Sequence, residues 1–173
     1  NAFRIKRCTM ASDYVILYTQ CIVERRGISQ ISGFRSGEGR WSKVCEKNRG
    51  KVIYFDFWAR WCPPCLAEME PLKQLRSKFS TDDLIIYSIC VSEPKEQWEE
   101  CLNEYSLKNR GIECVHVTDY LGIDNYQKIC KQWKIDRMPY YVLINRKGQI
   151  IDFGTAARPS NPQLVSRIEE AVK

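Results

Sequence analysis

The sequence has one histidine, no apolar run of membrane-spanning length, and no second closely spaced cysteine pair besides the one at positions 62 and 65. A transmembrane helix needs roughly 18 or more apolar residues in a row, so none is expected in this chain. Zinc takes four ligands; one Cys-x-x-Cys supplies two, and His116 falls within a predicted strand. The sequence also has no internal repeat and no low-complexity run, which is typical of a globular protein. No signal-peptide pattern follows Asn1, so we interpret the chain as a mature form or an excised piece.

The basic charge of the chain is concentrated near its beginning. Residues 1–50 hold ten Lys/Arg and four Asp/Glu, whereas residues 51–173 hold seventeen of each. A nucleic-acid-binding domain usually spreads its cations over a binding face, so the neutral larger part argues against a nucleic-acid partner. We predict a basic extension over residues 1–48 and a domain over residues 49–173. The charges of the extension are interpreted as a solvated surface, with membrane or acidic-partner contact as the alternative.

The nine cysteines divide into groups with different expected roles. An odd number cannot pair completely within one chain, and disulfide frameworks belong mainly to smaller secreted domains. Four lie in predicted strands or on apolar helix faces and are expected to be buried as small hydrophobic side chains: Cys90, Cys101, Cys114 and Cys130. Three lie in the predicted extension, where their spacing leaves the pairing open: Cys8, Cys21 and Cys45.

From residue 51 onward, apolar strands alternate with helical faces. Strands are expected at residues 51–58, 84–91 and 112–117, followed by a hairpin at 140–145 and 149–154. Helices are expected from the cysteine pair to Phe79, from Pro94, over 126–133, and from Pro162 with Ser160 or Asn161 as its N-cap. Upstream, the pattern favours a strand at 13–23, a loop at 27–40 and a short helix at 41–47. This order predicts a mostly parallel α/β sheet that ends in an antiparallel hairpin, with helices on both faces.

The chemistry is concentrated in the Trp-Cys-Pro-Pro-Cys segment at 61–65, directly between a strand and a helix. The helix N-terminus should lower the pKa of Cys62 and stabilise its thiolate. Cys65 lies one turn inside, where it should be less exposed. The motif therefore predicts that Cys62 attacks a substrate disulfide and that Cys65 releases the mixed disulfide. A zinc-binding or inert structural pair is the alternative.

The stretch FDFWARWCPPC at 55–65 resembles the active-site stretch of thioredoxins. Pro63, Pro64, Glu68 and the helix–strand insertion at 94–117 are similar to the TlpA/ResA branch of extracytoplasmic thiol-disulfide oxidoreductases. Ala-Arg-Pro-Ser at 157–160 is similar to thioredoxin-like proteins of Bacteroides-type bacteria. The resemblance covers roughly residues 50–173. It implies a thioredoxin fold, with a central mixed sheet, helices on both faces and a TlpA/ResA-type insertion.

The resemblance also implies roles for individual residues. Asp56 matches the buried acid that moves a proton to and from the second cysteine, and burial in an apolar strand should raise its pKa. Its alternative is an acid at a strand edge bonded to backbone. Pro139 matches the family's cis-proline, which would hold the Met138 backbone beside Cys62 to pair with substrate. The alternative is an ordinary trans proline. Trp61 is expected to shape the contact surface.

Four residues are candidates for tuning the site: Arg60, Pro63, Pro64 and Glu68. A solvated position is the alternative for Arg60 and for Glu68. Two departures from thioredoxin leave questions open. In thioredoxins, a proline five residues after the second cysteine kinks the helix. Here Pro71 comes six residues after Cys65, so we expect the kink to be shifted or the helix start to be altered. Ser88 falls near the position of thioredoxin's strand lysine, which leaves the proton path of Asp56 open.

The predicted function is a protein thiol–disulfide oxidoreductase that acts as a disulfide reductant, because the TlpA/ResA resemblance implies this direction and the motif lacks the histidine of strongly oxidising Cys-Pro-His-Cys sites. The implied partners are thiol- or disulfide-containing client proteins and a membrane or thioredoxin-type electron donor. We expect a monomer with no metal, no nucleic acid and no cofactor besides the Cys62–Cys65 disulfide. The implied setting is the periplasm of a Gram-negative bacterium, with export or anchoring through a region absent from this chain. The alternatives are a thiol peroxidase, disfavoured because no threonine shortly precedes Cys62, and a partner-docking module with structural cysteines.

Overall fold

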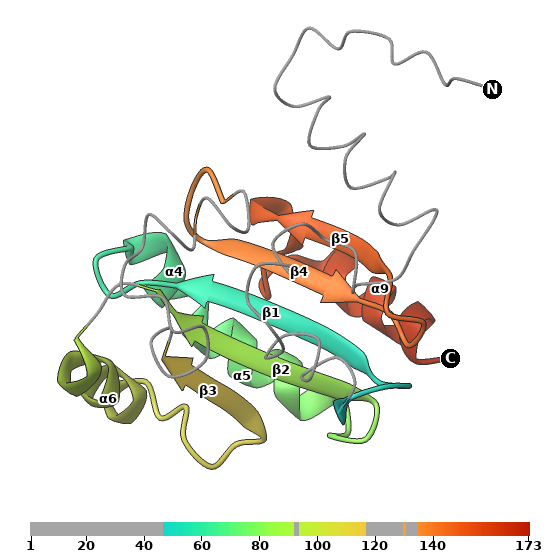
Figure 1. The fold of residues 1–173 in the computed structure, drawn as a ribbon, viewed down its shortest axis with the longest axis horizontal. Coiled ribbons are helices and arrows are strands. Elements are labelled where there is room, and N and C mark those ends of the chain that lie inside the picture. Colours follow the sequence, from blue (N-terminus) through green and yellow to red (C-terminus); the bar gives the residue numbers. More distant parts are fainter. Residues whose placement is uncertain (1–46, 92–93, 117–129, 131–134) are drawn as a thin grey trace, which may run out of the picture.

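The computed structural model describes residues 47–91, 94–116, 130 and 135–173, which form a sheet with helices packed against it (Figure 1). Five strands lie in the order β3-β2-β1-β4-β5. Their bounds are β1 Val52–Trp58, β2 Leu84–Cys90, β3 Ile112–His116, β4 Tyr140–Ile144 and β5 Ile150–Gly154. The pairs β1–β2 and β2–β3 are parallel, whereas β4 runs antiparallel to both β1 and β5. The predicted parallel sheet with a terminal hairpin is confirmed.

The central strand β1 is buried along its whole length, as its apolar sequence predicts. Alternate side chains of β1 point to opposite faces of the sheet, so both faces must be covered. Asp56 is the one charged residue of β1. The residues that pair with it on β2 and β4 point to the same face of the sheet. A single buried acid therefore stands in the middle of an apolar sheet, below the cysteine motif.

The helices are α4 Pro63–Ala67, α5 Met69–Lys78, α6 Lys95–Glu104 and α9 Pro162–Val172, with a short 3-10 turn η2 at Thr155–Ala157. In Figure 1, α5 and α9 lie behind the sheet, while α4 and α6 lie at the end where β1 and β2 finish. The side chain of Asn161 caps α9 by accepting a hydrogen bond from the Gln163 amide at 3.1 Å, and Pro162 is the first helical residue, as predicted. None of the helices in the described ranges is long and apolar enough to cross a membrane.

Several sequence predictions fall outside the described residues. They include the strand at 13–23, the loop at 27–40, and all of the helix at 41–47 except Lys47, which is helical. The helix predicted at 126–133 is described only at Cys130, which is helical. The boundary between a basic extension and a domain at residue 49 stays a prediction.

The single helix predicted after the cysteine motif is wrong, because the structure divides it into α4 and α5 at Glu68. Pro71 explains the break. In one continuous helix the residue at position 71 would donate a hydrogen bond to the carbonyl of Ala67, and proline has no N–H group. Starting a new helix at Met69 places Pro71 in a first turn, where a missing donor costs little. The Leu72 amide accordingly donates to the Glu68 carbonyl at 2.8 Å.

The prediction of burial for the four cysteines is half correct. Cys90 and Cys101 are buried, whereas Cys114 and Cys130 are only partly buried. Cys114 lies on β3, which is the last strand on its side of the described sheet, so its side chain lacks cover from a further strand. The predicted roles of Cys8, Cys21 and Cys45 lie outside the described residues.

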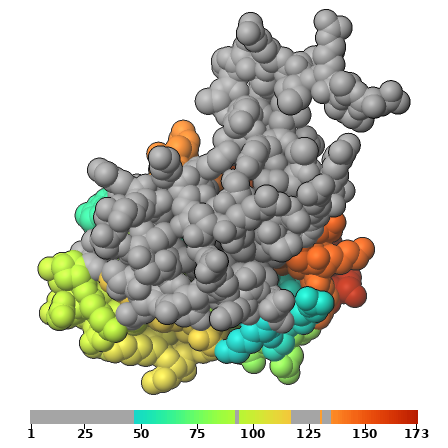
Figure 2. All heavy atoms as spheres, viewed as in Figure 1, coloured from blue at the N-terminus to red at the C-terminus, as the bar shows by residue number. Residues whose placement is uncertain are grey.

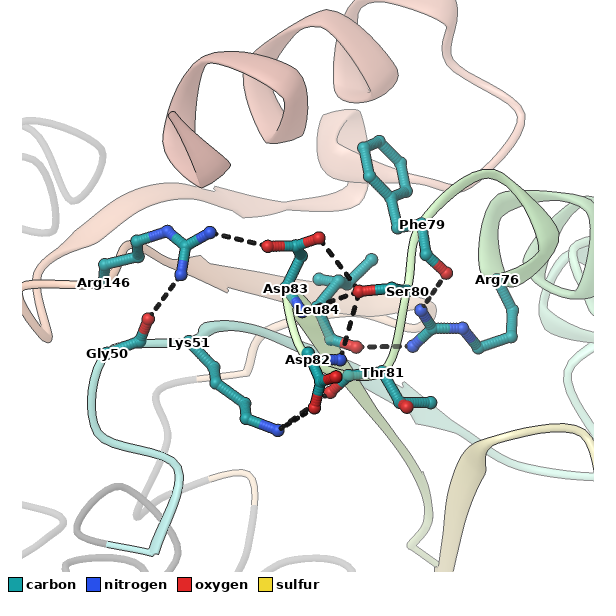
Figure 3. A network of polar contacts seen from close by, with 10 residues as sticks. All are labelled: Gly50, Lys51, Arg76, Phe79, Ser80, Thr81, Asp82, Asp83, Leu84 and Arg146. Carbon is teal, nitrogen blue, oxygen red and sulfur yellow. Dashed lines mark hydrogen bonds and ion pairs between the residues drawn. The ribbon is translucent and has the colours of Figure 1, made fainter.

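At the end of the sheet away from the cysteine motif, a network of hydrogen bonds and ion pairs holds the segments that precede β1 and β2 (Figure 3). The Arg146 guanidinium donates to the Gly50 carbonyl at 2.7 Å and to an Asp83 carboxylate oxygen at 2.7 Å. It also donates to the Val172 carbonyl at the end of α9, at 2.6 Å. One side chain therefore links the starts of β1 and β2 to the last helix.

Replacing Arg146 with methionine is expected to lower the free energy of unfolding by about 2 kcal/mol, because two backbone carbonyls lose a charged donor. Methionine keeps much of the apolar stem of arginine, so the change in the free energy of unfolding measures the loss of the guanidinium group. Urea unfolding monitored by tryptophan fluorescence measures it. The matched control is Lys147→Met at the neighbouring exposed position. Equal unfolding midpoints for the two variants would contradict the role given to Arg146.

Candidate active site

Cys62 and Cys65 form a disulfide at the start of α4, directly after the end of β1. Cys62 is the N-cap residue of the helix, and its own amide donates to the Ala59 carbonyl at 3.1 Å. The Cα atoms of the two cysteines are 5.2 Å apart. The motif therefore occupies the predicted strand–helix junction, with both sulfurs within one turn.

The two prolines determine which backbone donor faces the Cys62 sulfur. Pro63 and Pro64 fill the first two helical positions, and neither has an N–H group. The first amide available in the helix is that of Cys65, which donates to the Cys62 Sγ at 3.2 Å. This donor would favour a thiolate at Cys62. The two prolines thus leave the Cys65 amide as the first helix donor near the Cys62 sulfur, and their tuning role stays a prediction.

Access to the disulfide differs sharply from access to its neighbour Trp61. Cys62 is 4% exposed and Cys65 is 2% exposed, so Cys65 is the less exposed by only a small margin. The Trp61 side chain is 54% exposed. A large apolar ring beside a nearly covered sulfur offers a contact surface for an approaching peptide.

The Met138–Pro139 peptide bond is cis, as the resemblance implies. The register pairs Phe57 with Tyr140, so the next step along the antiparallel pair aligns Pro139 with Trp58 at the end of β1. Pro139 is buried and Met138 is partly buried. The structure therefore brings the cis-proline segment to the same end of β1 as the cysteine motif.

Asp56 is buried below the motif, and its carboxylate accepts a hydrogen bond from the Ser88 hydroxyl at 3.1 Å. Burial raises the pKa of Asp56 from 3.8 to about 7; the Ser88 hydrogen bond opposes this increase, and the charge of Glu68 adds to it. The predicted direction of the pKa shift is confirmed. The residue that replaces thioredoxin's lysine is a direct partner of the acid.

Glu68 lies at the break between α4 and α5 and is held by Ser160. One carboxylate oxygen accepts from the Ser160 hydroxyl at 2.6 Å, and the other accepts from the Ser160 amide at 2.8 Å. Glu68 is thus partly buried and hydrogen-bonded, and its tuning role stays a prediction. In the sequence, Ser160 stands out only as a possible N-cap of the last helix, and no local pattern links it to a residue 92 positions away.

Arg60 connects the motif to the inserted helix. Its guanidinium lies 3.5 Å from a carboxylate oxygen of Glu100 on α6, and both side chains are substantially exposed. Helix α6 forms part of the molecular surface, shown in yellow-green in Figure 2. An exposed ion pair contributes little stability, but it partly offsets the positive charge of Arg60 beside the motif.

The single histidine is the last residue of β3 and packs against an aromatic ring. His116 is buried, and its ring centroid is 5.4 Å from that of Trp98 on α6. Within the described ranges, no group of three or more His, Cys, Asp and Glu side chains is placed to hold a metal ion. His116 thus packs as an aromatic ring between the insertion and the sheet.

A residue missed by the sequence analysis is Tyr141, which the register pairs directly with Asp56. Its ring stacks on that of Tyr54, with centroids 5.8 Å apart. The Tyr54 hydroxyl donates to the Ala157 carbonyl at 2.6 Å. The only signal in the sequence is a tyrosine two residues after the cis-proline, in a strand that otherwise reads as core.

Comparison with known proteins identifies the family of this chain. The profile of the Redoxin family matches residues 42–172. A thiol-disulfide oxidoreductase named ResA from Bacillus anthracis is 26% identical over 104 residues, which cover 60% of this chain and 54% of the relative. ResA of Halalkalibacterium halodurans is 24% identical over 124 residues, covering 72% and 64%. The chain spans about half the length of most of these curated relatives.

Solved structures agree on the fold. The solution structure of a candidate thiol-disulfide oxidoreductase from Bacteroides vulgatus is 32% identical, with a TM-score of 0.57, and the match covers 72% of this chain and 76% of that one. The thioredoxin domain of another Bacteroides vulgatus thiol-disulfide oxidoreductase has a TM-score of 0.60 at 21% identity, covering 74% and 84%. The chain belongs to the Redoxin family, as a TlpA/ResA-like member of the thioredoxin superfamily.

Proposed function

We propose that this chain is a protein thiol–disulfide oxidoreductase that works by dithiol–disulfide exchange through Cys62 and Cys65. One observation carries the proposal: the two cysteines form a disulfide at the N-cap of α4, with a helix amide directed at the Cys62 sulfur. The ResA relatives and the Bacteroides vulgatus structure support it. The proposal includes no metal and no cofactor besides this disulfide.

The proposed reaction runs in two exchange steps. The Cys62 thiolate attacks one sulfur of a client disulfide, so a mixed disulfide forms and the other client sulfur leaves as a thiolate. Asp56 then accepts the proton of Cys65, and the Cys65 thiolate attacks the Cys62 sulfur. The Cys62–Cys65 disulfide forms and the second client thiolate leaves. The client gains two electrons and the protein loses two.

We further propose that the protein acts as a reductant in the periplasm of a Gram-negative bacterium. The TlpA/ResA resemblance supports this setting, and Pro63-Pro64 lacks the histidine of strongly oxidising motifs. A membrane or thioredoxin-type dithiol would return two electrons to the Cys62–Cys65 disulfide. Equilibration with a glutathione buffer tests the direction, because a potential near that of a strong oxidant contradicts it. The monomeric state is part of the same proposal.

Trapping with Cys65→Ala tests the reaction and its clients together. Without Cys65, the mixed disulfide at Cys62 has no internal thiol to resolve it, so disulfide-linked client proteins should accumulate. Non-reducing electrophoresis and mass spectrometry, after expression in a host that carries the natural clients, identify them.

The matched control is the double variant Cys62→Ala/Cys65→Ala, which should capture nothing. Capture of the same proteins by the double variant would show that another cysteine reacts and would contradict the proposal. Rapid consumption of hydrogen peroxide by the reduced wild type would instead favour the thiol peroxidase alternative.

A further inference from the structure

The hydroxyl of Tyr141 is buried without a hydrogen-bond partner in the described part of the chain. The Tyr141 side chain is 0% exposed, so bulk water does not supply that partner. A buried hydroxyl that makes no hydrogen bond costs free energy, and native structures keep few such groups. Phenylalanine would fill the same space without this cost, so the hydroxyl calls for a functional explanation.

The position of Tyr141 links the buried acid to the helix layer. Tyr141 and Asp56 are directly paired on adjacent antiparallel strands, so their side chains rise from neighbouring points on one face. A tyrosine side chain is longer than that of an aspartate, so the Tyr141 side chain can extend past the Asp56 carboxyl group.

The stacked ring of Tyr54 joins Tyr141 to the 3-10 turn η2. The two ring planes differ by only 8°, and the Tyr54 hydroxyl reaches the carbonyl of Ala157. Ala157 is three residues before Ser160, which binds the carboxylate of Glu68. Burial raises the pKa of Tyr141 most, the charges of Asp56 and Glu68 raise it further, and the charge of Arg158 lowers it.

We propose that Tyr141 is a positioning residue for proton transfer, whose hydroxyl holds a water molecule that connects the buried carboxyl group of Asp56 with Glu68. This inference rests on the proposed function, since it assigns a route to the proton that Asp56 takes from Cys65. The proton passes from Asp56 through the water to the Glu68 carboxylate and then to solvent. Burial keeps the pKa of Tyr141 above its usual range, so the residue stays a neutral donor and gains no charge.

The pH dependence of this route depends on all groups that face Asp56. On the described elements these are Tyr54 on β1, Ser88 on β2, Cys114 on β3, Tyr141 on β4 and Glu68 at the α4–α5 break, with Asp152 and Arg158 acting on the tyrosines. Tyr54 and Cys114 have raised pKa values and stay neutral near pH 7. Asp56, whose pKa burial raises to about 7, is therefore the group among them that gains or loses a proton in this range.

The test is Tyr141→Phe, with Tyr140→Phe as the matched control. Tyr140 is the adjacent residue, also largely buried, and points to the opposite face, where it contacts Phe57. Reduced protein is mixed rapidly with glutathione disulfide and quenched with acid. Mass spectrometry then gives the rate at which the Cys62–glutathione mixed disulfide converts to the Cys62–Cys65 disulfide, from pH 5 to pH 9.

Tyr141→Phe should slow this conversion about tenfold, the effect of losing one hydrogen bond to a charged group. It should also move the midpoint of the pH profile upward by about one unit, because the ionised form of Asp56 loses a donor. Tyr140→Phe should match the wild type in both. The melting temperature provides a second readout: a hydroxyl with no partner predicts a more stable phenylalanine variant, whereas a hydroxyl paired with water predicts no gain.

Two results separate this inference from the proposed function. If Tyr141→Phe matches the wild type in rate and midpoint and melts at a higher temperature, while Asp56→Asn abolishes the pH dependence, then the inference about Tyr141 is wrong and the role of Asp56 stands. If Asp56→Asn also leaves the profile unchanged, then both the inference and the proton-transfer role of Asp56 are wrong.

Discussion

Replacing Cys62 with serine should reduce disulfide exchange to the uncatalysed background. The proposed nucleophile is the thiolate of Cys62, whose sulfur in the disulfide accepts a hydrogen bond from the Cys65 amide at 3.2 Å. A serine hydroxyl can neither ionise near neutral pH nor form a disulfide. The loss should therefore be complete within the sensitivity of an assay that follows reduction of a peptide disulfide by the dithiol form of the protein.

The fold should survive this substitution. Serine is a preferred N-cap residue, so the start of α4 retains an acceptor for the Cys65 amide. The disulfide closes a loop between residues only three apart in sequence, and a loop this short contributes about 2 kcal/mol in the chain-entropy view. Unfolding measured with the wild type in its reduced form removes this difference. The two proteins should then unfold at similar urea concentrations.

Cys114→Ser provides the matched control for the Cys62 experiment. Cys114 is a partly buried free thiol, and burial raises its pKa to about 12. It should contribute almost no thiolate at neutral pH, so the variant should exchange disulfides at the wild-type rate. If Cys62→Ser kept more than a tenth of the activity, or if Cys114→Ser lost most of it, the assignment of the nucleophile would be wrong.

Sequence reasoning works where structure depends on neighbours along the chain. The apolar run of β1 predicts a strand buried on both faces, and the position of Cys62 between this strand and a helix predicts an N-cap sulfur. The cis bond at Pro139 follows from the resemblance rather than from local chemistry. These features depend on short segments or on a family pattern, so the amino-acid sequence is enough to predict them.

The features that the sequence does not reveal depend on which distant residues meet. Ser160 reaches Glu68 across 92 positions, and Tyr141 faces Asp56 only because β4 pairs with β1 in one particular register. A shift of that register by one residue would place Tyr140 beside the acid instead. Sequence periodicity predicts that a strand is buried but leaves its partner and register open, so the polar contacts of Asp56 could not be derived.

The break at Glu68 shows an intermediate case. Pro71 stands in the sequence and excludes an unbroken helix, since the carbonyl of Ala67 would lack its donor. The departure from thioredoxin is visible in the sequence, but whether a proline kinks a helix or starts a new one depends on the contacts around it. Here Glu68 is held by Ser160, and this contact fixes the junction between α4 and α5.

Replacing Asp56 with asparagine should stabilise the oxidised protein increasingly as the pH rises above about 4. The pKa of this carboxyl group rises from 3.8 to about 7 on folding, chiefly because of burial. Below about pH 4, both the folded and the unfolded chain hold the proton, so the acid carries no penalty. Between about pH 4 and pH 7 the unfolded chain releases its proton first, and the stability of the folded state falls as the pH rises.

Above about pH 7 the wild type bears the full cost of a buried carboxylate, which a shift of this size sets at about 4 kcal/mol. Asparagine has the same shape, never ionises, and can still accept the hydrogen bond from the Ser88 hydroxyl. Urea unfolding at pH 5, 6, 7 and 8 should therefore show a stability difference between Asp56→Asn and wild type that grows from about 1.5 kcal/mol at pH 5 to about 4 kcal/mol at pH 8.

Asp82→Asn is the matched control, because the side chain of Asp82 is 94% exposed. Its stability should follow that of the wild type at every pH. Asp83 acts in the opposite sense: its hydrogen bonds with Ser80 and Arg146 lower its pKa, so its contribution is lost as the pH falls. All three proteins share that contribution, and the difference between Asp56→Asn and wild type isolates Asp56. A difference that stayed constant from pH 5 to pH 8 would mean that Asp56 does not change its protonation in this range, and the proton-transfer role proposed for it would lose its physical basis.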